Sequence, residues 1–239
     1  TAMTSDTTPA LVRQFSPAAS ATGVSTNSLV TATFNEPMAP GTLTQTTFTL
    51  SITAGAAVTG AIHYADAGQT TVFAPATALA PSTSYTATLT TGVTDLSGTA
   101  LPAAIIWTFT TGTTADTTPP TVTLVVPADL STAVVIDKKI CATFSEPLDP
   151  MTITTATFTL TGPSAAPILG TIAYDAPSGI ATFLPVANLA ATTLYTATLT
   201  TGAADMTGNA LATSQVWTFT TGTVVGQQPV KLLKAGTFA

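Results

Sequence analysis

The chain contains one unit twice, and the two copies are separated by a constant spacing. Three landmarks recur 110 positions later: DTTP from Asp6 to Asp116, the segment around Glu36 (TATFNEPM) at Glu146 (CATFSEPL), and WTFTTG from Trp107 to Trp217. The constant spacing means that neither copy carries a net insertion. We therefore expect two tandem copies of one domain, each about the size of a single β-sandwich.

The repeat also predicts the domain boundaries. Domain 1 is expected at 1–112 with its core from about residue 6, domain 2 at 113–222 with its core from about residue 116, and a linker or the start of a following domain at 223–239. Only Thr113, Thr114 and Ala115 separate the repeats before Asp116, and two prolines follow at 119–120. A linker this short and stiff predicts two domains arranged end to end with limited bending.

Composition excludes several classes of protein. Threonine supplies about a quarter of the residues and charged residues only 7%, a balance that favours strands and offers no amphipathic helix. A net charge of −6 with five basic residues argues against nucleic-acid partners and against an anionic membrane surface. No run of about 18 apolar residues occurs, so we expect no membrane insertion. The single cysteine, Cys141, forms no internal disulfide, which is compatible with an extracellular bacterial protein.

Alternating apolar and polar residues predict seven strands in the second repeat. They span about 121–126, 139–145, 157–161, 170–175, 179–184, 194–200 and 215–221. Apolar side chains alternate with threonine along them, as at Tyr195, Ala197 and Leu199. One apolar face per strand is what two sheets packed face to face require.

A tyrosine at the start of the sixth strand identifies the kind of sandwich. LAPSTSY ends at Tyr85 and LAATTLY at Tyr195, an arrangement that resembles the tyrosine corner of immunoglobulin-like and fibronectin type III domains. With the DTTPP, TFSEPLDP, DMTGNAL and WTFTTG segments, both repeats resemble the bacterial Ig-like domain of S-layer proteins, adhesins and other surface proteins. The resemblance implies an all-β fold of two tandem seven-stranded, Ig-like (fibronectin III-like) β-sandwiches, and a role as spacer and scaffold at the bacterial cell surface or outside the cell.

Six aromatic residues are the expected core of the two sandwiches: Tyr85, Tyr195, Trp107, Trp217, Phe34 and Phe144. Cys141 falls between inward positions, so we expect it on the outer face without a redox role.

The chain lacks the residues of a nucleophilic site, because His63 is its only histidine and no GxSxG, HExxH or phosphate-binding loop is present. We predict a protein that is not an enzyme; a hydrolase would have to use paired carboxylates alone.

Three carboxylates keep their positions in both repeats of a chain that otherwise avoids charge. They are Asp6, Glu36 and Asp95 in the first repeat and Asp116, Glu146 and Asp205 in the second. Strand order places each trio at one end of its sandwich, together with Asp66 or Asp175, and in the second repeat this end faces the joint between the domains. Oxygen ligands of this kind suit calcium. The alternative is structural, since Asp and Glu at such positions accept hydrogen bonds from their own loops.

The last residues suggest what the two domains present. The segment Pro229–Ala239 resembles the opening of the bacterial ice-binding-like β-solenoid family, which implies a downstream domain that binds ice or another surface. The rival interpretation is that Val224, Val225, Val230, Leu232 and Leu233 add as a strand to a neighbouring molecule, building a filament or S-layer. The expected partners are therefore neighbouring domains of the same polypeptide, a second copy of the chain, or a surface reached through the downstream domain.

Overall fold

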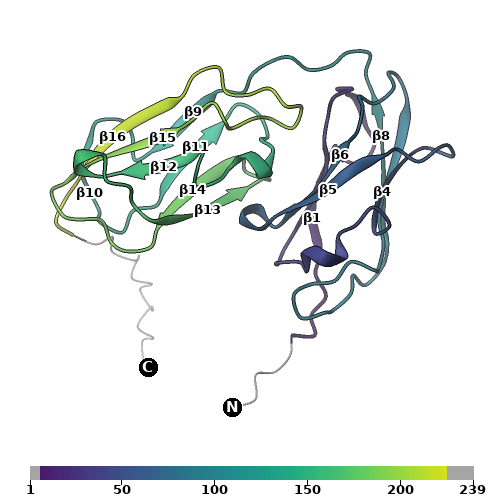
Figure 1. The fold of residues 1–239 in the computed structure, drawn as a ribbon, viewed down its shortest axis with the longest axis horizontal. Coiled ribbons are helices and arrows are strands. Elements are labelled where there is room, and N and C mark those ends of the chain that lie inside the picture. Colours follow the sequence, from purple (N-terminus) through teal and green to yellow (C-terminus); the bar gives the residue numbers. More distant parts are fainter. Residues whose placement is uncertain (1–5, 225–239) are drawn as a thin grey trace, which may run out of the picture.

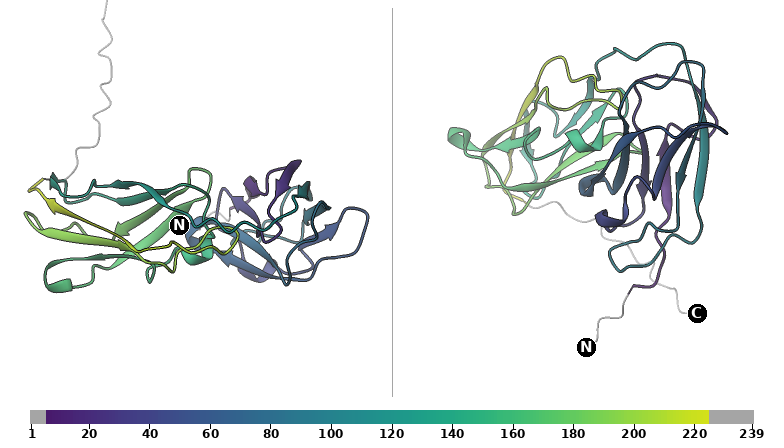
Figure 2. Two further views of the ribbon diagram at one scale, coloured as in Figure 1. Left: turned by 90° about the horizontal axis from the view of Figure 1, so that it is seen from above. Right: turned by 45° about the vertical axis from the view of Figure 1, so that its right-hand side comes forward.

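The computed structural model describes residues 6–224, which form two tandem β-sandwiches (Figure 1). Each sandwich consists of two four-stranded sheets, and each encloses its own cluster of buried apolar residues. The view from above shows both sandwiches as pairs of layers (Figure 2). The predicted all-β class and the tandem arrangement of sandwiches are confirmed.

Domain 1 contains eight strands. They are β1 (Val12–Ser16), β2 (Ala21–Val24), β3 (Val30–Phe34), β4 (Phe48–Ile52), β5 (Gly60–Ala65), β6 (Thr70–Pro75), β7 (Ser84–Leu89) and β8 (Ile105–Thr111). One sheet has the order β1-β3-β6-β5 and the other β2-β8-β7-β4. Two 3-10 turns, η1 (Pro40–Thr42) and η2 (Asp66–Gly68), lie in the loops.

Domain 2 repeats this plan. Its strands are β9 (Val122–Val126), β10 (Ser131–Val134), β11 (Ile140–Phe144), β12 (Phe158–Thr161), β13 (Gly170–Asp175), β14 (Ile180–Pro185), β15 (Leu194–Leu199) and β16 (Gln215–Thr221). The sheets have the orders β13-β14-β11-β9 and β10-β16-β15-β12. Two further 3-10 turns are η3 (Pro150–Thr152) and η4 (Pro163–Ala165).

The prediction of seven strands per domain was wrong by one, because β2 and β10 were missed. Pro17 and Pro127 directly follow the first strand of each domain. Proline cannot donate to a strand ladder, so the first strand ends there. The chain then crosses to the other sheet, where β2 pairs in parallel with β8, and β10 with β16. Four-residue strands are too short to show a clear alternation in sequence.

The alternation predicted on the longer strands is observed. On β15, Tyr195, Ala197 and Leu199 are buried while Thr196 and Thr198 are half-buried. The same holds on β7 for the equivalent residues, and on β8 and β16 the tryptophan and the phenylalanine two residues later are buried. Each core is therefore built from one face of each strand.

The two domains do not extend one another as the predicted rod. One end of domain 2 lies against the β1-β3-β6-β5 sheet of domain 1, so that the strands of the two domains run in different directions (Figures 1 and 2). The backbone N–H of Leu29 donates to the carbonyl of Met206 at 2.8 Å, and η2 of domain 1 contacts β13 of domain 2. The short linker limits the separation of the domains, but these lateral contacts decide their orientation.

Candidate functional site at the domain joint

Three carboxylates of domain 2 converge at the joint. Asp116, Glu146 and Asp205 each place one oxygen so that all three oxygens lie within 4.8 Å of one another. Calcium binds oxygen ligands at about 2.3–2.6 Å, so one ion could contact an oxygen from each residue. We call this end of domain 2, with its loops at 145–152 and 204–208, the carboxylate end of domain 2.

Local structure explains how the three side chains meet. Asp116 ends the linker, Glu146 follows β11 directly before Pro147, and Asp205 lies in the loop between β15 and β16. An isolated antiparallel bridge between Leu148 and Asp205 ties the last two segments together. Topology alone therefore brings residues from three separate segments to one point.

Two of the carboxylates also stabilise their own loops. Asp205 Oδ1 accepts from the backbone N–H groups of Thr207 at 2.7 Å and Asn209 at 2.9 Å, and the Asn209 side-chain amide donates to Oδ2 at 3.0 Å. Asp116 Oδ1 accepts from the N–H of Thr118 at 2.9 Å. These are the capping bonds that the structural alternative requires.

Glu146 is the electrostatically unfavourable member of the cluster. Partial burial, followed by the negative charges of Asp205 and Asp116, raises the pKa of Glu146 above its usual value. A bound cation at this point would reverse the effect of the two neighbouring charges. The cluster is thus a place where either a proton or a cation relieves repulsion.

The equivalent residues of domain 1 are arranged similarly, with one difference. Burial and the charges of Asp6 and Asp95 raise the pKa of Glu36, whereas hydrogen bonds led by the Ser97 hydroxyl lower the pKa of Asp95. Thr99 stands where domain 2 has Asn209, and Asp95 Oδ2 is buried without a hydrogen bond. Within residues 6–224, only the three carboxylates of domain 2 each place an oxygen within 4.8 Å of the other two.

Asn27 of domain 1 fastens the carboxylate end of domain 2. Its side-chain oxygen accepts from the N–H of Asp116 at 2.9 Å, and its amide nitrogen donates to the carbonyls of Asp116 at 3.0 Å and Thr207 at 2.9 Å. The sequence comparison missed Asn27 because its equivalent is Asp137. The signal that could have pointed to Asn27 is a difference between the two repeats and not a motif that they share.

A charged pair and a histidine lie further along the joint. Arg13 Nη1 is 3.7 Å from Asp175 Oδ1, and both side chains are about half exposed, so the pair adds little stability. His63 is exposed on β5. Burial raises the pKa of Asp149 on domain 2, and the hydrogen bond from the Met151 N–H and then the nearby His63 act in the opposite direction. No nucleophile accompanies His63 in a catalytic arrangement among the described residues.

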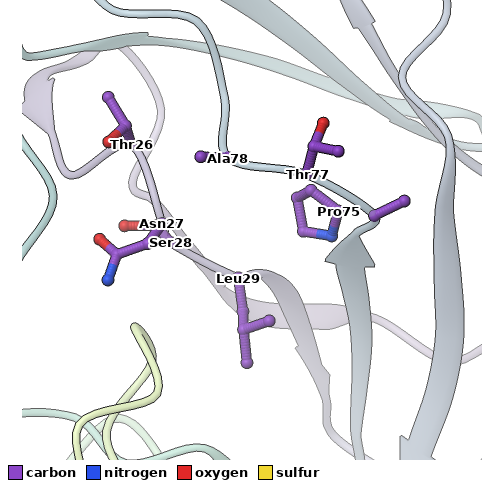
Figure 3. Close-up of a pocket in the computed structure, with 8 residues that line it drawn as sticks. Thr26, Asn27, Ser28, Leu29, Pro75, Thr77 and Ala78 are labelled. Atoms are coloured by element: carbon purple, nitrogen blue, oxygen red, sulfur yellow. The ribbon is translucent and has the colours of Figure 1, made fainter.

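A shallow pocket beside the joint offers no chemistry of its own. It has a volume of about 220 Å³ and is lined by Thr26, Asn27, Ser28, Leu29, Pro75, Ala76, Thr77 and Ala78 (Figure 3). Its lining includes no ionisable side chain, and the volume is below the range of about 300–1,000 Å³ usual for small-molecule sites. This pocket is therefore a poor candidate for a small-molecule site.

The six aromatic residues proposed for the core are all buried. They are Phe34, Tyr85, Trp107, Phe144, Tyr195 and Trp217. The hydroxyl of Tyr85 accepts from the N–H of Ala80 at 2.7 Å, and that of Tyr195 from the N–H of Ala190 at 2.8 Å. Cys141 is half-buried on the outer side of β11, with its Sγ 3.6 Å from Thr182 Oγ1.

The C-terminal predictions fall mostly outside the described residues. The solenoid-like segment Pro229–Ala239 and the tail residues from Val225 onward are not described. Val224 is exposed, and its carbonyl accepts from the N–H of Ile136 at 3.0 Å. The described helices, all short 3-10 turns, include none long and apolar enough to cross a membrane.

Comparison with protein families identifies both repeats. The family model described as "Bacterial Ig-like domain" matches residues 6–111 and 116–221. No curated protein matches the chain.

Solved structures give a looser likeness. L,D-transpeptidase 1 of Mycobacterium tuberculosis is 17% identical over 43% of this chain and 39% of its own, with a TM-score of 0.30. The N-terminal part of the bacterial S-layer protein SbsC is 12% identical over 89% of this chain and 44% of its own, with a TM-score of 0.37. An alpha-2-macroglobulin fragment from Escherichia coli is 16% identical over 91% of this chain and 73% of its own, with a TM-score of 0.36. The chain thus spans less than half the length of the first two structures.

Proposed function

The chain belongs to the bacterial Ig-like domain family, and from this premise we propose that it is a non-catalytic scaffold of a bacterial surface or secreted protein. In this role the two domains keep one relative orientation, and so they form a rigid bracket that positions a neighbouring domain of the same polypeptide. Bacterial Ig-like domains typically lack catalytic activity and belong to surface or extracellular proteins, which supports both parts of the proposal.

One observation carries the proposal: the joint is held by directional bonds on a short linker. Asn27 makes three hydrogen bonds across it, and the Leu29 N–H donates to Met206. Thr26 adds a backbone bond to the carbonyl of Thr114 in the linker at 3.1 Å. A joint with several directional contacts favours one orientation of the domains, which is what a positioning element needs.

The chemistry of the described residues supports a passive role. Their titratable groups are few, and two of the three convergent carboxylates, Asp116 and Asp205, accept hydrogen bonds from their own loops. The domain to be positioned is proposed to be an adhesive or ice-binding one, because the segment Pro229–Ala239 resembles the opening of the bacterial ice-binding-like β-solenoid family. The rival function is strand addition by the tail to build a filament or layer. It depends mainly on residues from Val225 onward, which are not described, and gains no support from the contacts above.

Small-angle X-ray scattering of the chain tests the proposal. A scaffold of fixed shape predicts that a single conformation with domain 2 seated against the sheet of domain 1 fits the scattering curve. A curve that requires an ensemble of widely different domain orientations contradicts it.

A further inference from the structure

The outer surface of one sheet differs in burial between the two domains. On β3 and β6 of domain 1, the outward residues Thr31, Thr33, Thr70 and Val72 are buried. Their equivalents on β11 and β14 of domain 2, Cys141, Thr143, Ile180 and Thr182, are only half-buried. The two strand pairs have the same register, so the difference comes from what covers them. We call these surfaces the outer face of domain 1 and the outer face of domain 2.

The carboxylate end of domain 2 is what covers the outer face of domain 1. At one edge of the face Met206 accepts from the N–H of Leu29. At the other edge the approach is so close that a Cβ on Gly68 would lie 2.9 Å from the carbonyl oxygen of Tyr174. The joint is therefore one example of a contact in which the carboxylate end of one Ig-like domain packs on the outer face of another.

The outer face of domain 2 carries exposed apolar side chains, and within residues 6–224 domain 1 of the same chain contacts this sheet only at its edge strand β13. Leu124 on β9 is 58% exposed and Leu184 on β14 is 42% exposed. Leu124 and Ile180 both pair with Thr143 and so lie on the same side of the sheet. Exposed apolar side chains gathered on one sheet face are typical of an interaction surface.

We propose that the outer face of domain 2 binds the carboxylate end of domain 1 from a second copy of the chain. The end required is present on domain 1, because the two domains are repeats. Leu96, which stands where domain 2 has Met206, is 70% exposed at that end. The contact joins two different surfaces, so each copy offers one end and one face to its neighbours. Association is head-to-tail and gives a closed ring or an open chain.

Charge complementarity favours this occupant. Lys138 and Lys139 stand where domain 1 has Ser28 and Leu29, the segment that lies beside Met206 at the joint. The incoming end of domain 1 carries Asp6, Glu36 and Asp95. With Arg13, these two lysines are the only Lys or Arg residues within 6–224, so the positive charge is concentrated where the acidic end is expected.

One difference between the repeats is expected to make the contact between two copies weaker than the contact between domains 1 and 2 within a chain. Asp137 replaces Asn27, and a carboxylate cannot donate to the two carbonyls that Asn27 serves. The contact is also not aided by a covalent linker. Association is therefore expected to depend on protein concentration and to weaken in salt.

Sedimentation velocity of the full chain over a range of concentrations tests the proposal. The weight-average mass is expected to rise with concentration. Leu124→Arg blocks the face and Leu96→Arg blocks the end, and each is expected to weaken association by about tenfold or more. Val216→Arg is the matched control, because Val216 is 52% exposed on β16 in the other sheet, and it is expected to change nothing.

Mixing the two blocked variants identifies head-to-tail contact. Each retains one of the two surfaces, so an equimolar mixture is expected to form dimers and nothing larger. Lys139→Glu is expected to abolish association, and adding Glu36→Lys to the same chain to restore it. A chain that stays monomeric at all concentrations overturns the proposal. Association that persists in both blocked variants also overturns it, and so does a mixture that fails to form dimers.

Discussion

The side chain of Asn27 in domain 1 grips the backbone of Asp116, the residue at which domain 2 begins. It accepts from the Asp116 N–H at 2.9 Å and donates to the Asp116 carbonyl at 3.0 Å, in the manner of a backbone segment. The paired bonds leave little freedom for the linker to rotate. One amide thus couples the orientation of the second sandwich to the first.

Asn27→Ala is expected to loosen the joint while leaving both sandwiches folded. It removes three partly buried hydrogen bonds, each contributing about 1 kcal/mol. We expect the unfolding transitions of the two domains to separate in calorimetry, while circular dichroism stays unchanged. Asn188→Ala, at an exposed position of domain 2, is the control. Transitions that remain as coupled as in the parent chain would count against a coupling role for Asn27.

Tyr195→Phe is expected to destabilise domain 2 by about 1 kcal/mol, because it leaves the partly buried N–H of Ala190 without its acceptor. Tyr85→Phe should have the same effect on domain 1. Chemical denaturation of each variant measures the loss. Two unchanged midpoints would show that these hydroxyl bonds contribute nothing.

Calcium is expected to stabilise domain 2 if the converging carboxylates of Asp116, Glu146 and Asp205 bind it. The measurement is the melting temperature in millimolar calcium and in chelator, with Glu146→Gln as the variant that removes one ligand. A rise in the parent chain that disappears in the variant supports the site. Identical melting in calcium and chelator leaves loop capping as the only role of these residues.

Without calcium, Glu146→Gln is expected to stabilise the protein slightly at neutral pH. The folded-state pKa of Glu146 is raised, so the ionised form is less favourable in the folded protein than in the unfolded one. This penalty is present above the raised pKa and is relieved as the pH falls through it to the usual glutamate range. The gain, below about 1 kcal/mol for a partly exposed group, should therefore vanish in acid. Melting curves of both proteins across this pH range measure it, and a constant difference at all pH values would refute the electrostatic explanation.

The sequence reveals much of each sandwich and little of the joint. Alternation around residues such as Phe34 and Trp217 predicts which face is buried, because the period of a strand is two, and strand order alone brings Asp116, Glu146 and Asp205 together. The extra strands β2 and β10 are too short to show that period. The joint depends on contacts between unlike surfaces, and Asn27 is one of the positions at which the repeats differ, since Asp137 is its equivalent. A comparison of what the two repeats share therefore could not identify Asn27.

Tyr64 and Tyr174 also make contacts that the sequence does not reveal. Each hydroxyl accepts from a backbone N–H in the loop after the third strand of its domain, at Met38 and Leu148 respectively. Burial, the largest influence, raises the pKa of both phenols. These bonds anchor the loop beside each carboxylate trio. Each bond joins a strand to a loop that lies 26 residues earlier in the sequence, so no local motif reveals it.

The fixed orientation of the domains is tested most directly by a distance between them. Spin labels at Ile106→Cys in domain 1 and Leu194→Cys in domain 2, both exposed positions, are introduced with Cys141→Ser. Double electron–electron resonance is expected to give one narrow distance distribution that broadens when Asn27→Ala is added. A distribution that is already broad in the chain with Asn27 intact would contradict the bracket and, with it, the proposed scaffold.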